Sequence, residues 1–325
     1  MSLVTAAGCF TLVTPPEPEP EPARTRRDPA PVLRYEPIHA SQFEVGPGPL
    51  TVESNIMLSL YTWFHAKDYT PRRVEFPSHD PDQRVVVHWL LPPGEGPHPT
   101  VIVFPILAGS HVVSEALAKA LVNNGLAVAR LERQALEFET AEEPEVVADA
   151  LALAVRDARR LLDWLETRPE VDTSRLAAAG ISLGGIMACL LQGVDPRIGA
   201  GFFMLTGGGL AEIIHDSTEK PVRAFRNRLL EKLGNPDRDE FIAWLRPYTE
   251  EVEPLRYAGG LDASRVYLAS GRFDRVIHPA RTEALWHELG EPDWTRLPVG
   301  HYQGLPFLWW TVSRAVEHLD DVFAE

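Results

Sequence analysis

Strand-like and helix-like segments alternate regularly through the middle of the sequence, and this alternation limits the fold more than any other feature. Short apolar runs predict buried strands, and most are followed by segments whose apolar residues recur every three or four positions, as on one face of a helix. Strands joined through helices are connected by crossovers, so they run parallel. A parallel sheet needs cover on both faces. The sequence therefore predicts an α/β fold: a mostly parallel sheet with helices on both faces.

The expected elements follow from these patterns. Strands are expected at 100–104, 126–131, 176–181, 200–205, 265–269 and 294–297. Helices are expected at 114–123, 147–165, 184–192, 281–289 and 307–323. An antiparallel strand pair is expected ahead of them, at 73–76 and 84–90, around a turn at 79–82.

The same reading divides the chain into three parts. Residues 1–48 are rich in proline and are expected to be tail and linker. Residues 49–206 and 261–325 form the α/β domain, with an apolar lead-in near its start. The alternation pauses over residues 207–260, where helical patterns, charges and aromatics such as Phe225, Trp244 and Tyr248 accumulate. We expect this segment, called the cap segment below, to be a helical cap that controls substrate size.

Composition and charge exclude several classes of protein. The 325 residues are 45% hydrophobic and 24% charged, as in a soluble globular protein with a sizeable core. The net charge of −15 argues against a nucleic acid partner, because phosphates would be repelled. Two cysteines are too few for a disulfide framework, and Cys189 is expected to be a buried small hydrophobe. No P-loop, dinucleotide fingerprint or metal-ligand spacing is present, so neither a cofactor nor a metal is expected.

The first residues have a pattern of their own. Ala6-Ala7-Gly8-Cys9 resembles the lipobox of bacterial lipoproteins, and a stiff acidic Pro-Glu spacer follows it. Only eight residues precede Cys9, with no basic region, so a signal peptide requires a start upstream of Met1. In that case we expect an envelope lipoprotein, with membrane contact only through a lipidated Cys9. Otherwise the segment is a frayed tail and the protein is expected in the cytoplasm.

Gly180-Ile181-Ser182-Leu183-Gly184 lies between a predicted strand and a predicted helix. Gly-x-Ser-x-Gly in that position is the pattern of a nucleophile elbow, a sharp turn that projects the serine hydroxyl above the sheet. Glycine is required on either side because the turn brings neighbouring backbone too close for a Cβ atom. We therefore expect Ser182 to be a nucleophile, the alternative being a plain Gly-rich turn.

A serine hydroxyl needs a base to take its proton, and an acid to orient that base. In an elbow fold the acid and then the histidine follow the serine along the chain. Asp274 follows the predicted strand at 265–269, and His301 follows the strand at 294–297. Both positions lie at the sheet edge where active-site loops emerge. We expect Asp274 to be the acid and His301 the base.

Other residues compete for these roles. His278 lies four residues after Asp274 and is the alternative base, although a surface position is expected for it. His111 is expected at a helix start near the mouth of the site. Asp216 lies in the cap segment and Asp262 precedes a strand, so both are weaker candidates for the acid.

A tetrahedral oxyanion needs two hydrogen-bond donors. The first is expected to be the backbone N–H of Leu183, immediately after the nucleophile. The second is expected from the loop after the strand at 100–104, where Ile106 or Leu107 can donate. Pro105 cannot, since it lacks an N–H. Three arginines of the cap segment, Arg223, Arg226 and Arg228, are expected on a solvated face, the alternative being contact with an anionic substrate.

With Gly-x-Ser-x-Gly-Gly at 180–185, Gly-x-x-Asp at 271–274 and Gly-His at 300–301, the chain resembles the α/β-hydrolase superfamily. The most similar branch is the dienelactone-hydrolase, acyl-esterase and prolyl-oligopeptidase-like group, over about residues 73–323. The resemblance implies the α/β-hydrolase fold and a triad of Ser182, Asp274 and His301. Dienelactone hydrolases proper carry a cysteine nucleophile, so Ser182 points away from that exact activity.

Together these features predict a serine hydrolase that cleaves a carboxylic ester or related acyl compound through an acyl-enzyme. The expected partner is a small acyl substrate. A peptidase or amidase is the alternative among enzymes, because the same triad cleaves both kinds of bond. A non-catalytic binding protein that retained the fold is the alternative outside enzymes.

Overall fold

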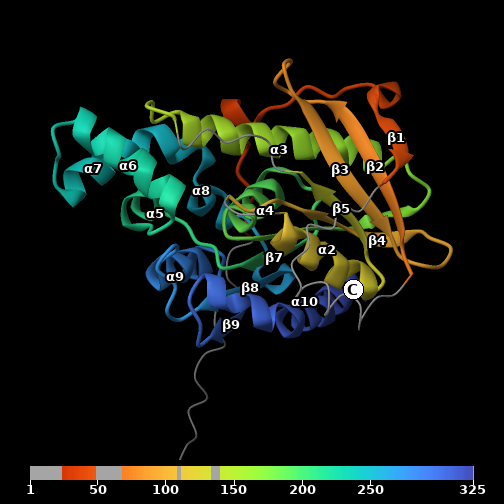
Figure 1. Cartoon of the computed structure of the whole chain (residues 1–325). Coiled ribbons are helices and arrows are strands. Elements are labelled where there is room, and N and C mark those ends of the chain that lie inside the picture. Colours follow the sequence, from red (N-terminus) through yellow and green to blue (C-terminus); the bar gives the residue numbers. More distant parts are fainter. Residues whose placement is uncertain (1–23, 49–67, 108–110, 133–139, 325) are drawn as a thin grey trace, which may run out of the picture.

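The computed structural model describes residues 24–48, 68–107, 111–132 and 140–324 (Figure 1). Within them a nine-stranded sheet has the order β1-β2-β3-β5-β4-β6-β7-β8-β9. The strands are β1 (Glu44–Pro47), β2 (Thr70–Pro77), β3 (Arg84–Leu91), β4 (His98–Val103), β5 (Ala127–Leu131), β6 (Val171–Ile181), β7 (Ala200–Met204), β8 (Val266–Gly271) and β9 (Asp293–Leu297).

Helices connect and flank these strands. The α-helices are α2 (Val112–Asn123), α3 (Val146–Leu165), α4 (Leu183–Val194), α5 (Leu210–Asp216), α6 (Lys220–Lys232), α7 (Arg238–Thr249), α8 (Pro254–Ala258), α9 (Pro279–Glu288) and α10 (Leu308–Ala324). Short 3₁₀ turns are η1 (Pro31–Leu33), η2 (Ala40–Gln42), η3 (Glu250–Val252), η4 (Ala263–Arg265) and η5 (Tyr302–Phe307).

The sheet is parallel from β5 through β9, and antiparallel from β1 to β5. The predicted α/β fold class is confirmed, and so is the antiparallel pair of β2 and β3. Because the parallel strands all end at one edge, the loops that follow β4, β6, β8 and β9 emerge together. The residues expected to react all lie in or next to these loops.

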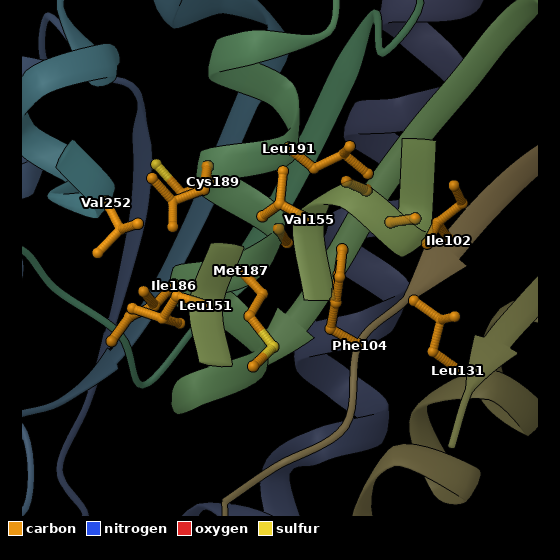
Figure 2. Packing of buried hydrophobic residues seen from close by; sticks show 14 of the residues in the cluster. Ile102, Phe104, Leu131, Leu151, Val155, Ile186, Met187, Cys189, Leu191 and Val252 are labelled. Carbon is orange, nitrogen blue, oxygen red and sulfur yellow. The ribbon is translucent and has the colours of Figure 1, made fainter. Parts of the chain in front are cut away.

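Helices cover both faces of the sheet, with α3 on one face and α2 and α10 on the other (Figure 1). Helix α3 follows its predicted pattern, since Val147, Leu151, Val155 and Leu162 form a buried stripe. This stripe packs with α4 and the sheet in the larger of two apolar clusters (Figure 2). The packed core beneath α4 supports the turn that begins this helix.

The interpretation of residues 1–48 as tail and linker is wrong for residues 24–48. Leu33 is fully buried, Phe43 is buried against Phe76, and β1 pairs with β2 at the edge of the sheet. Proline suits such a segment because an edge strand and irregular turns do not need every N–H. Burying the side chain of Leu33 alone contributes about 1.5–3 kcal/mol to folding. The proline content of the segment gives no sign of this contact.

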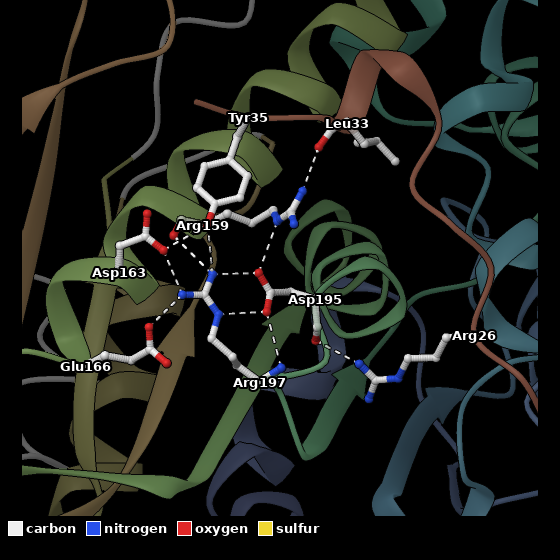
Figure 3. Close-up of polar contacts among 8 residues, drawn as sticks. All are labelled: Arg26, Leu33, Tyr35, Arg159, Asp163, Glu166, Asp195 and Arg197. Carbon is white, nitrogen blue, oxygen red and sulfur yellow. Dashed lines mark hydrogen bonds and ion pairs between the residues drawn. The ribbon is translucent and has the colours of Figure 1, made fainter. Parts of the chain in front are cut away.

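Polar contacts also tie this N-terminal segment to the domain (Figure 3). Arg26 donates to the carbonyl of Asp195 at 2.8 Å, and the Tyr35 hydroxyl donates to Asp163 at 2.8 Å. Arg197 forms ion pairs of 2.7 Å with both Asp163 and Asp195, and Arg159 pairs with Asp195 at 3.0 Å. The segment is therefore an integral part of the fold.

The cap segment carries α5, α6, α7, η3 and α8 in its described residues and contributes no strand to the sheet. Helices α5, α6 and α7 lie together at the end of the molecule away from β1 to β3 (Figure 1). The apolar lead-in expected before β2 and the lipobox-like stretch at Cys9 lie outside the described residues.

Candidate active site

Ser182 lies at the turn between β6 and α4 in a strained backbone conformation. Its φ is 57° and its ψ is −123°. Such a conformation costs about 1–3 kcal/mol and persists only where the surroundings hold it. Here the N–H of Ser182 donates to the carbonyl of Met204 on β7 at 2.8 Å, and the carbonyl of Ser182 accepts from Gly185 and Ile186. The turn has the geometry of a nucleophile elbow.

The two glycines of the motif have no room for a side chain. A Cβ at Gly180 would lie 2.1 Å from the carbonyl oxygen of Gly184. A Cβ at Gly184 would lie 2.8 Å from the carbonyl oxygens of Phe104 and Pro105. These are backbone atoms that cannot rotate away, so the expected need for glycine at both positions is met by the geometry.

His301 lies between Ser182 and Asp274 and contacts both. Its Nε2 is 2.9 Å from the Oγ of Ser182, and its Nδ1 is 2.7 Å from an oxygen of Asp274. A carboxylate can only accept, so Nδ1 carries the proton and donates to Asp274. The unprotonated Nε2 is then free to accept the serine proton. The structure brings together the three residues that the sequence analysis expects to react.

Asp274 is held rigidly in the loop after β8. It is only 4% exposed, and its second carboxylate oxygen accepts from the backbone N–H groups of Val276 (2.8 Å) and Ile277 (2.9 Å). The loop after β9, which carries His301, passes so close that a Cβ at Gly271 would lie 2.6 Å from the carbonyl oxygen of Val299. Neighbouring parallel strands thus place acid and base side by side.

The expected oxyanion donors border the same space as Ser182. Leu183 is the first residue of α4, where a backbone N–H has no acceptor within its own helix. Ile106 and Leu107 follow β4, and both line the cavity with Leu183. The close approach of Gly184 to Phe104 packs this loop against the start of α4.

A largely aliphatic cavity, partly open to solvent, extends from Ser182. Its apolar lining comes from both the α/β domain and the cap segment. The side chains from the cap segment are Leu210, Ile213, Ile214, Ser217, Glu219 and Val222. A cavity of this character suits a small ligand with an apolar portion.

The aromatic and basic residues of the cap segment do not line this cavity. Phe225 is fully buried in the core, and Trp244 packs between Phe241 and Tyr248. These rings stabilise the segment itself. Aliphatic side chains of α5 and α6 border the cavity instead, and control of substrate size by the cap segment stays a prediction.

The three cap arginines also lie outside the cavity lining. Arg223 is exposed. Arg226 donates to the carbonyl of His215, and Arg228 donates to the carbonyl of Ala141 at 3.0 Å. Their contacts fit a structural role at the surface of α6 better than contact with an anionic substrate.

The competing histidines and acids lie elsewhere. His278 is exposed and accepts from the N–H of Ala280 at the start of α9. His111 precedes α2, Asp216 pairs with Arg238, and Asp262 accepts from its own turn. None of these residues contacts Ser182 in the described structure.

Cys189 is fully buried on α4, as expected. Burial and the negative charge of Glu253 raise the pKa of its thiol to about 12, so it stays protonated and unreactive.

Two residues of the cavity were not anticipated from the sequence. Glu219, just before α6, is buried in the lining, and it accepts a hydrogen bond from the hydroxyl of Tyr302. Desolvation of the hydroxyl and its hydrogen bond with Glu219 raise the pKa of the Tyr302 phenol, which therefore stays neutral, although the residue is 62% exposed. Tyr302 is the direct neighbour of His301 in the chain, a signal that was available. Nothing in the sequence pattern marks Glu219, which only the tertiary fold brings to the site.

Within the described residues, no group of three or more His, Cys, Asp or Glu side chains is placed to hold a metal ion. In the same part of the chain, no helix combines the length and apolar character needed to cross a membrane.

Comparisons with known proteins establish the fold. No family model and no curated protein matches the sequence. An acetyl xylan esterase from Paenibacillus sp. R4 has a similar structure, with a TM-score of 0.64 and 18% identity over 87% of this chain and 89% of that one. Acetyl xylan esterase 1 from Thermoanaerobacterium sp. JW/SL YS485 matches with a TM-score of 0.57 and 14% identity, over 89% of this chain and 96% of that one.

A third similar structure is the acylaminoacyl peptidase of Pyrococcus horikoshii. It matches with a TM-score of 0.57 and 12% identity, over 80% of this chain and 42% of that one. The α/β-hydrolase fold expected from the sequence motifs is confirmed by these likenesses.

Proposed function

We propose that this protein is a serine hydrolase that cleaves a carboxylic ester through an acyl-enzyme on Ser182. One observation carries the proposal: Ser182, His301 and Asp274 form a continuous relay at the wall of an apolar cavity. The strained turn at Ser182 adds support, since such strain concentrates at functional sites.

In the first half-reaction the Oγ of Ser182 attacks the acyl carbon while Nε2 of His301 takes its proton. The buried carboxylate of Asp274 stabilises the imidazolium that forms. The oxyanion accepts from the N–H of Leu183 and from a second backbone donor at Ile106 or Leu107. When the tetrahedral intermediate collapses, the imidazolium gives its proton to the leaving alcohol, and Ser182 keeps the acyl group.

In the second half-reaction a water molecule replaces the alcohol. His301 takes a proton from this water, whose oxygen attacks the acyl carbon. A second tetrahedral intermediate collapses, the proton returns to the Oγ of Ser182, and the carboxylic acid leaves. The aliphatic lining of the cavity favours an acyl chain of several carbons, since each buried methylene contributes about 0.8 kcal/mol.

Hydrolysis of p-nitrophenyl esters of increasing acyl length, beside the matching p-nitroanilides, tests the proposal. We expect the turnover of esters to increase as the acyl group becomes longer than acetyl. Ser182→Ala should lose at least about 10³-fold of this turnover. Circular dichroism of Ser182→Ala checks that its fold is intact. Faster cleavage of anilides than of esters would indicate an amidase or peptidase instead. Absence of both activities in folded wild-type protein would contradict the proposal.

A further inference from the structure

Glu219 is an acidic side chain in a largely aliphatic cavity. It is 9% exposed and lies in the same lining as Ser182 and His301. Removing a carboxylate from water is costly unless other groups replace the lost hydrogen bonds and charge. An aliphatic cavity that only bound an apolar chain would gain nothing from such a group.

The described residues give this carboxylate one side-chain hydrogen bond. The hydroxyl of Tyr302 donates to one oxygen of Glu219, whereas a carboxylate has about four acceptor positions. Neither oxygen is a fully buried atom without a partner, so the other oxygen is open to solvent. No ion pair to Glu219 occurs among the described residues. Lys220 and Arg223, the basic residues nearest to it in the sequence, are exposed. Glu219 therefore lacks a cationic partner within the described structure.

The position of Glu219 relative to the relay is defined by Tyr302. The rings of His301 and Tyr302 have centroids 5.5 Å apart, and the hydroxyl of Tyr302 reaches Glu219. Desolvation of its hydroxyl raises the pKa of Tyr302, and so do the hydrogen bond with Glu219 and the negative charges of Glu219 and Asp274. Tyr302 thus links the carboxylate of Glu219 to the neighbourhood of His301 in the cavity lining.

We propose that Glu219 binds a protonated amine on the substrate, so that the enzyme acts on acyl compounds whose aliphatic chain carries an ammonium group. The ammonium supplies a positive charge and N–H donors, which the described residues do not offer to Glu219. The methylene chain contacts the aliphatic wall between Glu219 and Ser182. This specificity rests on the proposed hydrolase function of the same site.

Binding of matched ester pairs to the Ser182→Ala variant tests the inference without requiring turnover. Methyl 6-aminohexanoate is compared with methyl heptanoate, and methyl 4-(dimethylamino)butyrate with methyl 5-methylhexanoate. Each pair differs only by a protonated nitrogen in place of a carbon. By calorimetry at pH 7, we expect the ammonium ester of at least one pair to bind at least about tenfold more tightly than its neutral counterpart.

Two double variants locate the origin of this preference. Glu219→Gln keeps an acceptor for Tyr302 but removes the charge. The ratio of the affinities for the ammonium ester and its neutral counterpart should therefore fall to about one. Glu231→Gln removes an equal charge from an exposed position on α6 and should keep the preference. If Glu219→Gln does not fold, the inference is judged from the affinities of Ser182→Ala for the two esters of each pair.

Equal binding within both pairs, binding of no ester, or a preference that survives Glu219→Gln would overturn the inference. Failure of the hydrolase proposal is distinguishable from these results. If the wild-type protein hydrolyses p-nitrophenyl esters but Ser182→Ala shows no ammonium preference, the hydrolase proposal holds and the ammonium site is refuted. If Ser182→Ala prefers ammonium esters but the wild-type protein hydrolyses no ester, the ammonium site holds and the hydrolase proposal is refuted.

Discussion

Replacing Gly180 by alanine should damage both stability and activity, for one geometric reason. The new Cβ would lie 2.1 Å from the carbonyl oxygen of Gly184, where real Cβ atoms essentially never come within 3.0 Å. The strand and the first turn of α4 must therefore separate by about 1 Å or more. Overpacking of this kind costs about 1–3 kcal/mol, which lowers the melting temperature by roughly 3–10 °C in a domain of this size.

The same displacement acts on the nucleophile, two residues away. A shift of about 1 Å at a catalytic group reduces the rate about 10²-fold, so Gly180→Ala should lose at least that factor in kcat/KM. Thermal unfolding by circular dichroism and hydrolysis of p-nitrophenyl butyrate measure the two effects.

Gly199→Ala is the matched control, because its Cβ would make an ordinary 3.7 Å contact with the carbonyl oxygen of Leu176. It should keep the melting temperature within about 2 °C and nearly all activity. Equal melting temperatures and equal kcat/KM values for Gly180→Ala and Gly199→Ala would refute the steric argument.

Four further results are expected. Asp274→Asn should keep the fold but lower kcat about 10⁴-fold, because an amide no longer holds the histidine in its productive tautomer, and near-normal turnover would contradict this role. His278→Ala should keep most of the activity, and a loss comparable to that of Asp274→Asn would instead make this histidine the base. Cys189, with its raised pKa of about 12, should resist iodoacetamide at pH 8 in native protein and react only after unfolding, as read by peptide mass spectrometry. Arg197→Ala should destabilise by about 2–3 kcal/mol at neutral pH, since it leaves buried Asp195 with fewer partners. Burial alone would raise the pKa of Asp195, but hydrogen bonds from Arg197 and Arg159 hold it below its ordinary 3.8. The difference in free energy of unfolding between wild type and Arg197→Ala is therefore present above about pH 4, and it should shrink as the pH falls through the pKa of Asp195 in the folded protein. A difference that stays unchanged in acid would contradict this cause.

Local patterns predicted the sheet and the relay well because both depend on short segments. Hydrophobic periodicity located the parallel strands and the stripe on α3. The glycines at 180 and 184 indicated the elbow through a steric requirement that operates within five residues. Asp274 and His301 could be placed because parallel neighbours end at the same edge.

Features that depend on distant contacts were missed. Leu33 and Phe43 look like isolated apolar residues in a proline-rich stretch, and only the folded domain provides the surface that buries them. The first residues of β6, from Val171, alternate poorly in polarity and were assigned to no strand. Glu219 is one of many charges in the cap segment, and both its burial and its contact with Tyr302 arise only in the tertiary fold.

The central claim is that Ser182 is the residue that becomes acylated. A fluorophosphonate probe forms a covalent bond with a serine only when that serine is activated as a nucleophile. After labelling of native protein and digestion, mass spectrometry should find the probe on the peptide that contains Ser182. Labelling should be absent in Ser182→Ala and much slower in His301→Ala. Labelling of another residue, or none in folded wild-type protein, would contradict the account.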